Sequence, residues 1–360
     1  MFSSFQSREF SCQVPDVVFK ISSDRAQVTV TVTKAGDEKE VYSEYLYPDS
    51  ESRIRLSDVD CLLEPYVNRW LLFSLDVRIV EERVTTDSGN ESVTTVDERT
   101  LSSEILSCNA NILNTTASSW CDFHFLTLID GARTTAMGWQ ERLCYIGSDT
   151  ASCTAWYDDG SSQSMSVPVI TGVGDCKIID CSPVNFLKLG LRLMRYTITA
   201  GSRKQDYEVD HDVEPEVAPV LLFWNSFGVQ ELAYCTGELK QVSSFDRKQA
   251  RIGRLKETYQ MEEKESFKAD TGILTFPMAN WWREVLRSRD VRVMHVYNGS
   301  FIVDYGTPVV ITSEKMELSN TPEHLPRITF EYEYADRNHN IFDVRAEGRI
   351  FDDTFDYTFN

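Results

Sequence analysis

Long hydrophobic runs are missing from this 360-residue sequence. Its longest apolar stretches, such as Val220–Trp224, fall far short of the roughly 20 residues that a helix needs to cross a bilayer. The opening residues, MFSSFQSREFSCQVPD, place Arg8 and Glu9 where a secretory signal requires an uninterrupted apolar core. We therefore expect no membrane partner, and a protein that is made and folded in a cytoplasm.

Positive charge is also scarce. The chain has 36 Lys and Arg residues against 56 Asp and Glu residues, which gives a formal net charge of −20 at pH 7. A surface of this sign repels nucleic acids and anionic membranes over most of its area, so we expect no nucleic-acid partner. With 42% apolar and 26% charged residues, the composition is that of an ordinary folded protein, long enough for two or three domains.

Motifs that carry catalysis or hold a cofactor are absent. None of the five histidines stands in an HExxH or HxH spacing, and no GxSxG elbow, GxxxxGK[ST] loop or GxGxxG turn occurs. CKIIDC, residues 176–181, lacks the second ligand pair of a zinc site. DRNHN, residues 336–340, lacks the glycine and glutamate of a calcium loop. The sequence thus predicts no catalytic residue, no metal and no cofactor.

The nine cysteines are an odd number with no repeated spacing. The disulfide framework of a small secreted domain has an even number of cysteines at regular spacings. We therefore expect buried free thiols in a reducing compartment, and a protein that is insensitive to redox conditions.

Acidic residues beside aromatic ones keep a carbohydrate-binding or glycoside-hydrolysing protein open as an alternative, because glycosidases use two carboxyl groups in a groove. Two such groups of neighbours occur: Asp158 and Asp159 beside Trp156 and Tyr157, and Glu331 and Glu333 beside Tyr332 and Tyr334. With 56 acidic residues in the chain, such neighbours also arise by chance. On a strand, the acidic residues would face solvent and the aromatic residues the core.

What the sequence does contain is alternation of apolar and polar residues with a period of two. In AQVTVTVTKAGDEKEVYSEYLYPDS, residues 26–50, Val28, Val30 and Val32 alternate with threonines before a turn at Gly36. This pattern predicts a β-hairpin.

Helical signals are short and few. SDVDCLLEPYV, residues 57–67, offers Ser57 as an N-cap and Pro65 as an early stop. NWWREVLRSRD, residues 280–290, predicts a helix of two or three turns. Strands dominate, and we predict an all-β chain: β-sandwich domains with a few short helices and a C-terminal extended arm.

Polar and proline-bearing joints indicate the domain boundaries. DHDVEPEVAP, residues 210–219, separates a first half rich in Ser, Thr and Cys from a second half richer in Arg and Trp. The sequence predicts one or more N-terminal β-rich domains over residues 1–213, a C-terminal β-sandwich-like domain over residues 214–345, and an arm over residues 346–360.

Two segments indicate contacts with other molecules. KQVSSFDRKQARIGRLK, residues 240–256, is basic within an acidic chain, either as a solvated face or as a loop that docks on the acidic surface of a neighbouring copy. The C-terminal arm alternates aromatic and polar residues, as a strand added to a sheet edge would. The predicted assembly contacts are Lys240, Arg247, Lys248, Arg251, Arg254, Lys256, Phe351, Phe355, Tyr357 and Phe359.

Three stretches carry a resemblance to a known group of proteins: EVYSEYLYPDSESRIRLSDVDCLLEPYV, LLFWNSFGVQELAYCTG and ITFEYEYADRNHNIF. Together they cover well under half of the chain, and they resemble tail and baseplate proteins, of the distal-tail type, from bacteriophages that infect Bacteroides-like bacteria. The resemblance implies β-sandwiches that form rings joining a tail tube to the host-binding apparatus, with no catalytic residue.

The second of these stretches is interpreted as a structural hairpin. Gly228 supplies the backbone freedom that its turn needs. The hairpin residues predicted to lie in the core are Phe223, Trp224, Phe227 and Tyr234.

From these features we expect a virion structural protein, a subunit of a phage tail or baseplate ring. Its predicted partners are copies of itself and other virion tail proteins, and its predicted location is the virion, after synthesis in the bacterial host cytoplasm. The alternatives are a carbohydrate-binding or glycoside-hydrolysing β-sandwich protein, and a bacterial surface or fimbrial subunit, which the missing secretion signal disfavours.

Overall fold

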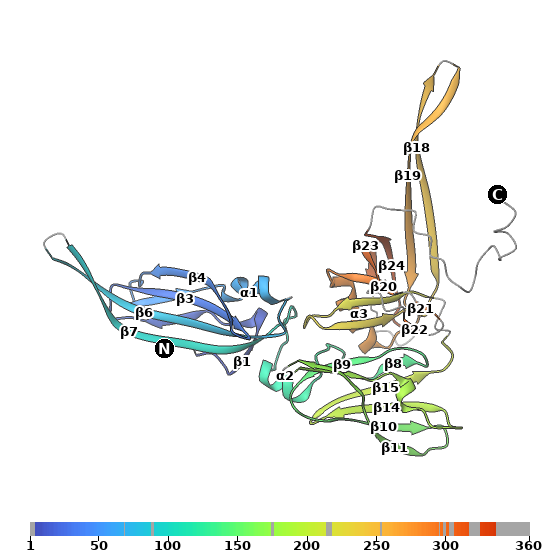
Figure 1. The fold of residues 1–360 in the computed structure, drawn as a ribbon, viewed down its shortest axis with the longest axis horizontal. Coiled ribbons are helices and arrows are strands. Elements are labelled where there is room, and N and C mark those ends of the chain that lie inside the picture. The colour runs from blue at the N-terminus through green and yellow to red at the C-terminus, as the bar shows by residue number, and fades with distance from the viewer. Residues whose placement is uncertain are drawn as a thin grey trace.

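The computed structural model describes residues 4–67, 69–87, 90–173, 176–213, 218–252, 254–294, 296–297, 300–301, 306–316 and 325–335. Strands dominate, and the helices are short: α1 (Val59–Val67), α2 (Ala117–Phe123), α3 (Phe276–Arg287), and the 3₁₀ turns η1 (Ser11–Gln13) and η2 (Pro183–Phe186). The chain is all-β, as the sequence predicts (Figure 1).

Several predictions fall on residues that the structure does not describe. These are DRNHN at residues 336–340, most of the joint at residues 214–219, and the whole C-terminal arm at residues 346–360. The four predicted contacts of the C-terminal arm are therefore outside the described residues: Phe351, Phe355, Tyr357 and Phe359.

A five-stranded sheet forms the first part of the fold, in the order β1-β7-β6-β3-β4. Its strands are β1 (Arg8–Phe10), β3 (Arg25–Lys34), β4 (Asp37–Leu46), β6 (Leu72–Asp87) and β7 (Asn90–Leu106). The predicted β3–β4 hairpin is confirmed, and its valines, Val28, Val30 and Val32, are fully buried. They share one core with helix α1 and with the two-stranded sheet of β2 (Val17–Lys20) and β5 (Arg53–Leu56).

Helix α1 differs from its sequence prediction at both ends. It begins at Val59, one residue later than a cap at Ser57 implies, and it continues past Pro65 to its last residue, Val67. Val59, Leu63 and Val67 lie on one face and are buried in the first core. Burial of each apolar side chain of this type stabilises the fold by about 1.5–3 kcal/mol. The three together outweigh the roughly 3 kcal/mol that a proline inside a helix costs.

Two further sheets form the second part, in the orders β11-β10-β14-β15-β8 and β12-β13-β9. Their strands are β8 (Arg133–Ala136), β9 (Arg142–Ile146), β10 (Ala151–Tyr157), β11 (Ser162–Ser166), β12 (Val169–Val173), β13 (Cys176–Asp180), β14 (Leu193–Ala200) and β15 (Arg203–Asp210). Their inward side chains make a separate core, in which the rings of Tyr196 and Tyr207 stack with centroids 4.6 Å apart.

A seven-stranded sheet forms the third part, in the order β17-β16-β20-β23-β24-β19-β18. Its strands are β16 (Val220–Trp224), β17 (Gln230–Tyr234), β18 (Leu239–Ile252), β19 (Leu255–Asp270), β20 (Val291–Met294), β23 (Thr307–Met316) and β24 (Ile328–Tyr334); β21 (Val296–Tyr297) and β22 (Ser300–Phe301) pair separately. The predicted helix is confirmed as α3, which begins at Phe276 because the Thr275 side chain accepts a hydrogen bond from the Met278 backbone N–H. Its Trp281 and Trp282 are buried in this third core.

The hairpin predicted in LLFWNSFGVQELAYCTG is confirmed as β16 and β17. Gly228 takes a φ of 70° in its turn, a conformation that few other residues adopt at low cost. The buried Asn225 organises the turn, because its Oδ1 accepts the backbone N–H groups of Phe227 and Val229, both at 3.0 Å. The predicted core residues are buried except Trp224, which is half-buried at the edge of a cleft.

Two long hairpins extend beyond the sheets to which they belong (Figure 1). β6 and β7 remain paired as far as Asp87, whereas β3 accompanies β6 only up to Glu82. β18 and β19 are paired from Leu239 to Ile252, whereas β24 accompanies β19 only over Phe267–Asp270. Most of β18 and β19 is therefore a two-stranded ribbon that projects from the body of the molecule.

Candidate functional site

The six basic residues predicted as assembly contacts lie on the β18–β19 hairpin, residues 239–270. From here on we call this hairpin the arm, and we call residues 346–360 the C-terminal arm. All six are exposed: Lys240, Arg247, Lys248 and Arg251 on β18, Arg254 between the strands, and Lys256 on β19. The prediction of a loop is wrong, since this segment is a β-ribbon. A ribbon with solvent on both sides lacks the apolar–polar alternation that marks a half-buried strand, so the pattern is absent from its sequence.

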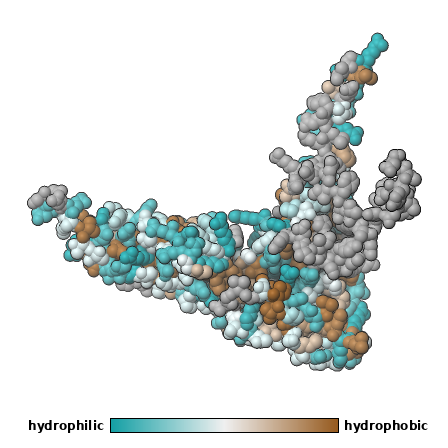
Figure 2. All heavy atoms as spheres, in the orientation of Figure 1, coloured by the Kyte–Doolittle hydropathy of each residue, from teal (hydrophilic) through white to brown (hydrophobic). Residues whose placement is uncertain are grey.

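Positive charge is concentrated at the tip of the arm. Residues 247–256 contain five basic residues and no acidic one, and Figure 2 shows hydrophilic residues there. The strand register places Arg251 opposite Lys256. Because like charges opposite each other on paired strands repel, an acidic partner at this tip would stabilise it.

Apolar side chains are exposed along the same arm. Val242 is 55% exposed, Phe245 51% and Leu255 67%. β18 is the last strand of its sheet and, among the described residues, pairs only with β19, which leaves its outer backbone groups open to another strand. A two-stranded ribbon is at best marginally stable in water, so these features favour a partner that covers the arm.

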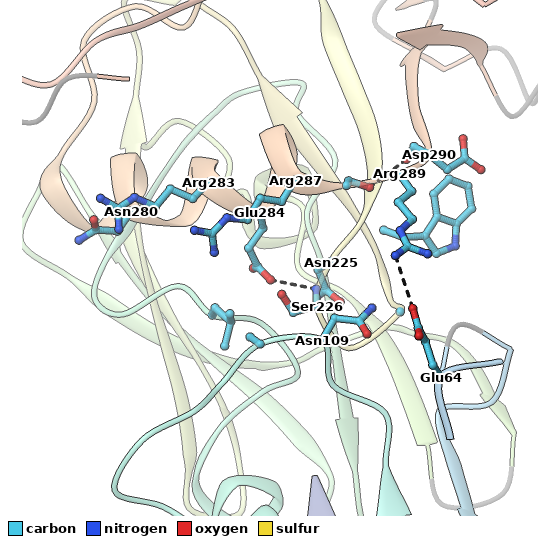
Figure 3. Close-up of a pocket in the computed structure, with 15 residues that line it drawn as sticks. Glu64, Asn109, Asn225, Ser226, Asn280, Arg283, Glu284, Arg287, Arg289 and Asp290 are labelled. Atoms are coloured by element: carbon cyan, nitrogen blue, oxygen red, sulfur yellow. Dashed lines mark hydrogen bonds and ion pairs between the residues drawn. The ribbon is translucent and has the colours of Figure 1, made fainter. Parts of the chain in front are cut away.

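A cleft of about 620 Å³ lies where the first and third parts of the fold meet (Figure 3). Helix α1 contributes Glu64, the segment after β7 contributes Asn109, and the β16–β17 turn contributes Ser226. The C-terminal half of α3 and the residues after it supply Arg283, Glu284, Arg287 and Arg289. Arg289 Nη2 lies 3.7 Å from Glu64 Oε1, so this exposed ion pair spans the cleft.

Glu284 is the most unusual residue of this cleft, because it is a carboxyl group only 7% exposed. Its Oε1 accepts the Ser226 backbone N–H at 2.9 Å, whereas its buried Oε2 has no hydrogen-bond partner among the described atoms. Burial, with a smaller effect of the nearby Glu231, raises the pKa of Glu284 to about 7. The cleft therefore combines an acid that titrates near neutral pH with three arginines.

A second group of ionisable residues is enclosed between the second and third parts. Arg133 Nε lies 3.0 Å from Glu141 Oε2, and its Nη1 lies 3.2 Å from Glu231 Oε2. The Trp281 ring stacks under the guanidinium at 4.6 Å, and its Nε1 donates to Glu231 Oε2 at 3.1 Å. Burial raises the pKa of Glu141 to about 7. Since none of the three charged residues is more than 5% exposed, this group is a buried link between β8 and β17.

The two pairs of acidic residues considered as glycosidase sites make contacts within the protein. Asp158 and Asp159 lie in the β10–β11 turn, where they accept the backbone N–H groups of Arg192 and Ser161. On β24 the acidic and aromatic residues lie on opposite faces, as the strand period predicts: Tyr332 is buried, and Glu331 pairs with Lys268 at 3.6 Å.

The nine cysteines are all free, and six of them are buried. The sulfur nearest to Cys176 belongs to Cys144, at 3.1 Å on the neighbouring strand, rather than to the other cysteine of CKIIDC. Among the described residues, Asp58, Asp60 and Cys61 bring three possible metal ligands within 4.8 Å. They form a surface acidic cluster, which marks no metal site by itself.

Comparisons with known proteins do not identify a family for this chain. No protein-family model matches the chain, and no curated protein matches it. Among solved structures, the I9–I11 tandem from titin is 9% identical, covering 93% of this chain and 90% of the titin chain, with a TM-score of 0.15. A likeness this weak carries no argument. None of the described helices is long and apolar enough to cross a membrane.

Sequence reasoning missed the cleft, because its lining comes from segments far apart in the chain. One signal was present in NWWREVLRSRD. Glu284 lies between Trp281 and Val285 on the apolar face of the expected helix, and both neighbours are buried. A carboxyl group on the core-facing side of an amphipathic helix indicates a buried acid with a special role.

Proposed function

We propose that this chain is a structural subunit of a virion, part of a phage tail or baseplate ring, and that it assembles through its arm. The observation that supports this proposal is the arm. It is a ribbon with a basic tip and an open edge strand, and it exposes Val242, Phe245 and Leu255. In a chain of net charge −20, another copy supplies the acidic surface that such an arm favours. The assignment to a virion is supported by the resemblance of three stretches to distal-tail-type proteins.

The particle mass of the purified chain tests this function. We expect assemblies with masses that are multiples of 41.2 kDa, ring-shaped in electron micrographs, and dissociating as salt approaches about 1 M, because salt screens the charged contacts. A chain that remains at 41.2 kDa at every concentration, in low salt and with other tail proteins present, contradicts the proposal.

Carbohydrate binding is a second candidate, favoured by the cleft. Its volume of about 620 Å³ falls within the range of small-molecule sites. Asn109, Asn280 and Arg283 present hydrogen-bonding groups to it, and Trp224 lies at its edge. Isothermal titration with a panel of neutral and acidic oligosaccharides tests this candidate: binding that is lost on Arg283→Ala supports it, and the absence of any binding rejects it.

A further inference from the structure

β4, the outer strand of the first sheet, carries the opposite charge to β18, the outer strand of the arm. Among the described residues it pairs only with β3, so its second edge is open. The backbone N–H and C=O groups along this edge are open to another strand, and on the same strand Tyr45 is 45% exposed. Lys39 is the one basic residue of β4, whose exposed acidic residues are Asp37, Glu38, Glu40 and Glu44.

The other described edges of the three large sheets fit the arm less well. β1 has three residues, and β11 has five residues with no charge among them. β8 has four residues and β17 five, and both are largely buried. β7 and β19 also have open edges, because β1 pairs with β7 only over Glu104–Leu106 and β24 pairs with β19 only over Phe267–Asp270. On β7, Glu98 is already paired with Arg78, and on β19 the acidic residues are interspersed with Lys256 and Lys264. β4 combines ten residues with four exposed acidic side chains and a single lysine.

The charges of these two edge strands determine which pairs can form. Two copies of β4 repel each other, and so do two copies of β18, whose four basic residues stand against the single acidic Asp246; charged edges prevent pairing with their own kind in this way. β4 against β18 brings opposite charges together, so the same residues that exclude the wrong pairs favour this one. With fourteen residues, β18 is long enough to pair along all ten residues of β4.

We infer that β18 of one copy adds to the β4 edge of a second copy. Arg247, Lys248 and Arg251 then lie along the acidic side chains of the neighbour's β4, and the arm extends the neighbour's first sheet. Within one chain the arm projects away from the first sheet (Figure 1), so the contact joins two copies. Two different surfaces meet in it, and a contact of this kind repeats around a ring or along a filament. The inference rests on the self-assembly proposed above and names its two surfaces.

Charge reversal on each strand tests the contact. The arm variant is Arg247→Glu, Lys248→Glu and Arg251→Glu, and the edge variant is Glu38→Lys, Glu40→Lys and Glu44→Lys. Sedimentation velocity at low salt measures the dissociation constant of self-association, and circular dichroism reports the fold. We expect each variant to raise that constant at least tenfold. The variant that carries all six changes exchanges the two signs, and we expect it to associate again to within threefold of the wild type.

A charge-matched control separates this contact from a general effect of net charge. The edge variant changes the charge by the same amount as Asp122→Lys, Glu208→Lys and Asp212→Lys, three exposed residues that lie away from β4 and the arm. We expect this control to associate like the wild type or more tightly, because it lowers the net negative charge without touching either edge.

Each outcome decides between the two claims. A wild-type chain that does not self-associate overturns both the proposed assembly and the β4 contact. Association that neither the arm variant nor the edge variant weakens leaves the assembly standing and overturns the β4 contact. Weakening by both without recovery in the sixfold variant also overturns it, because direct pairing of the two strands requires recovery. Weakening of association by the arm variant alone shows that the arm binds another surface.

Discussion

Arg133 and Glu231 lie 3.2 Å apart in a site where neither is more than 5% exposed. Arg133 comes from β8 of the second part, and Glu231 comes from β17 of the third part. With Glu141 at 3.0 Å, the arginine balances two buried carboxyl groups between two hydrophobic cores. This group therefore fixes how the second and third parts are joined.

Replacing Arg133 by alanine is expected to lower the free energy of unfolding by about 3–5 kcal/mol, because it leaves two carboxyl groups buried without a cation. Urea denaturation followed by tryptophan fluorescence measures the change. Arg142→Ala, at an exposed position on β9, is the control and should stay within about 0.5 kcal/mol of the wild type. A loss below about 1 kcal/mol in the Arg133 variant would show that this group does not hold the two parts together.

Glu284 makes stability depend on pH with a definite sign. Its pKa is raised from 4.5 in the unfolded chain to about 7 in the folded protein, so between these values the folded state binds more protons. Stability therefore falls as pH rises from about 4.5 to about 7, and the penalty is fully present above that range.

Glu284→Gln removes this penalty while keeping the acceptor for the Ser226 N–H. We expect the variant to be about 2–3 kcal/mol more stable than the wild type at pH 8, with a smaller difference at pH 4. Thermal unfolding at a series of pH values measures it, with the exposed Glu208→Gln as control. A variant that is less stable than the wild type at pH 8 would refute the pKa assignment.

Cys144 and Cys176 are expected to form the first disulfide under mild oxidation. Their sulfur atoms lie 3.1 Å apart on adjacent strands. Cys12 and Cys108 also contact each other, but both of their thiols donate to the Ala110 carbonyl, at 3.0 and 3.2 Å. Cys61, the exposed thiol, has no close sulfur partner among the described contacts. Diamide treatment followed by peptide mass mapping without reduction checks this, and Cys176→Ser should abolish the product. This prediction departs from the sequence-based expectation of redox insensitivity, which assumed buried thiols, because Cys12, Cys61 and Cys176 are not buried. A different pair oxidised first would count against it.

The parts of the fold that the sequence predicted are those where local and tertiary preferences agree. Alternating valines in β3 and the turn residues Asn225 and Gly228 each specify one hairpin, because period and turn chemistry act within a few residues. Helix α1 passes Pro65 because burial of Leu63 and its neighbours, a tertiary effect, outweighs the local cost. The sequence did not predict that the arm is a β-ribbon. A ribbon solvated on both sides has no core-facing side, so its sequence lacks the apolar–polar alternation that identifies a strand.

The central claim, assembly through the arm, is tested most directly by shortening the arm. Residues 243–265 can be replaced by an Asn-Gly turn, because Val242 and Ser266 are paired across the ribbon and the core residues Phe267 and Ala269 remain. Light scattering then gives the particle mass of the full-length and shortened proteins, with circular dichroism as the folding control. Our account predicts an assembly for the full-length chain and a folded monomer for the shortened chain. A shortened chain that folds and still assembles to the full-length mass would contradict it.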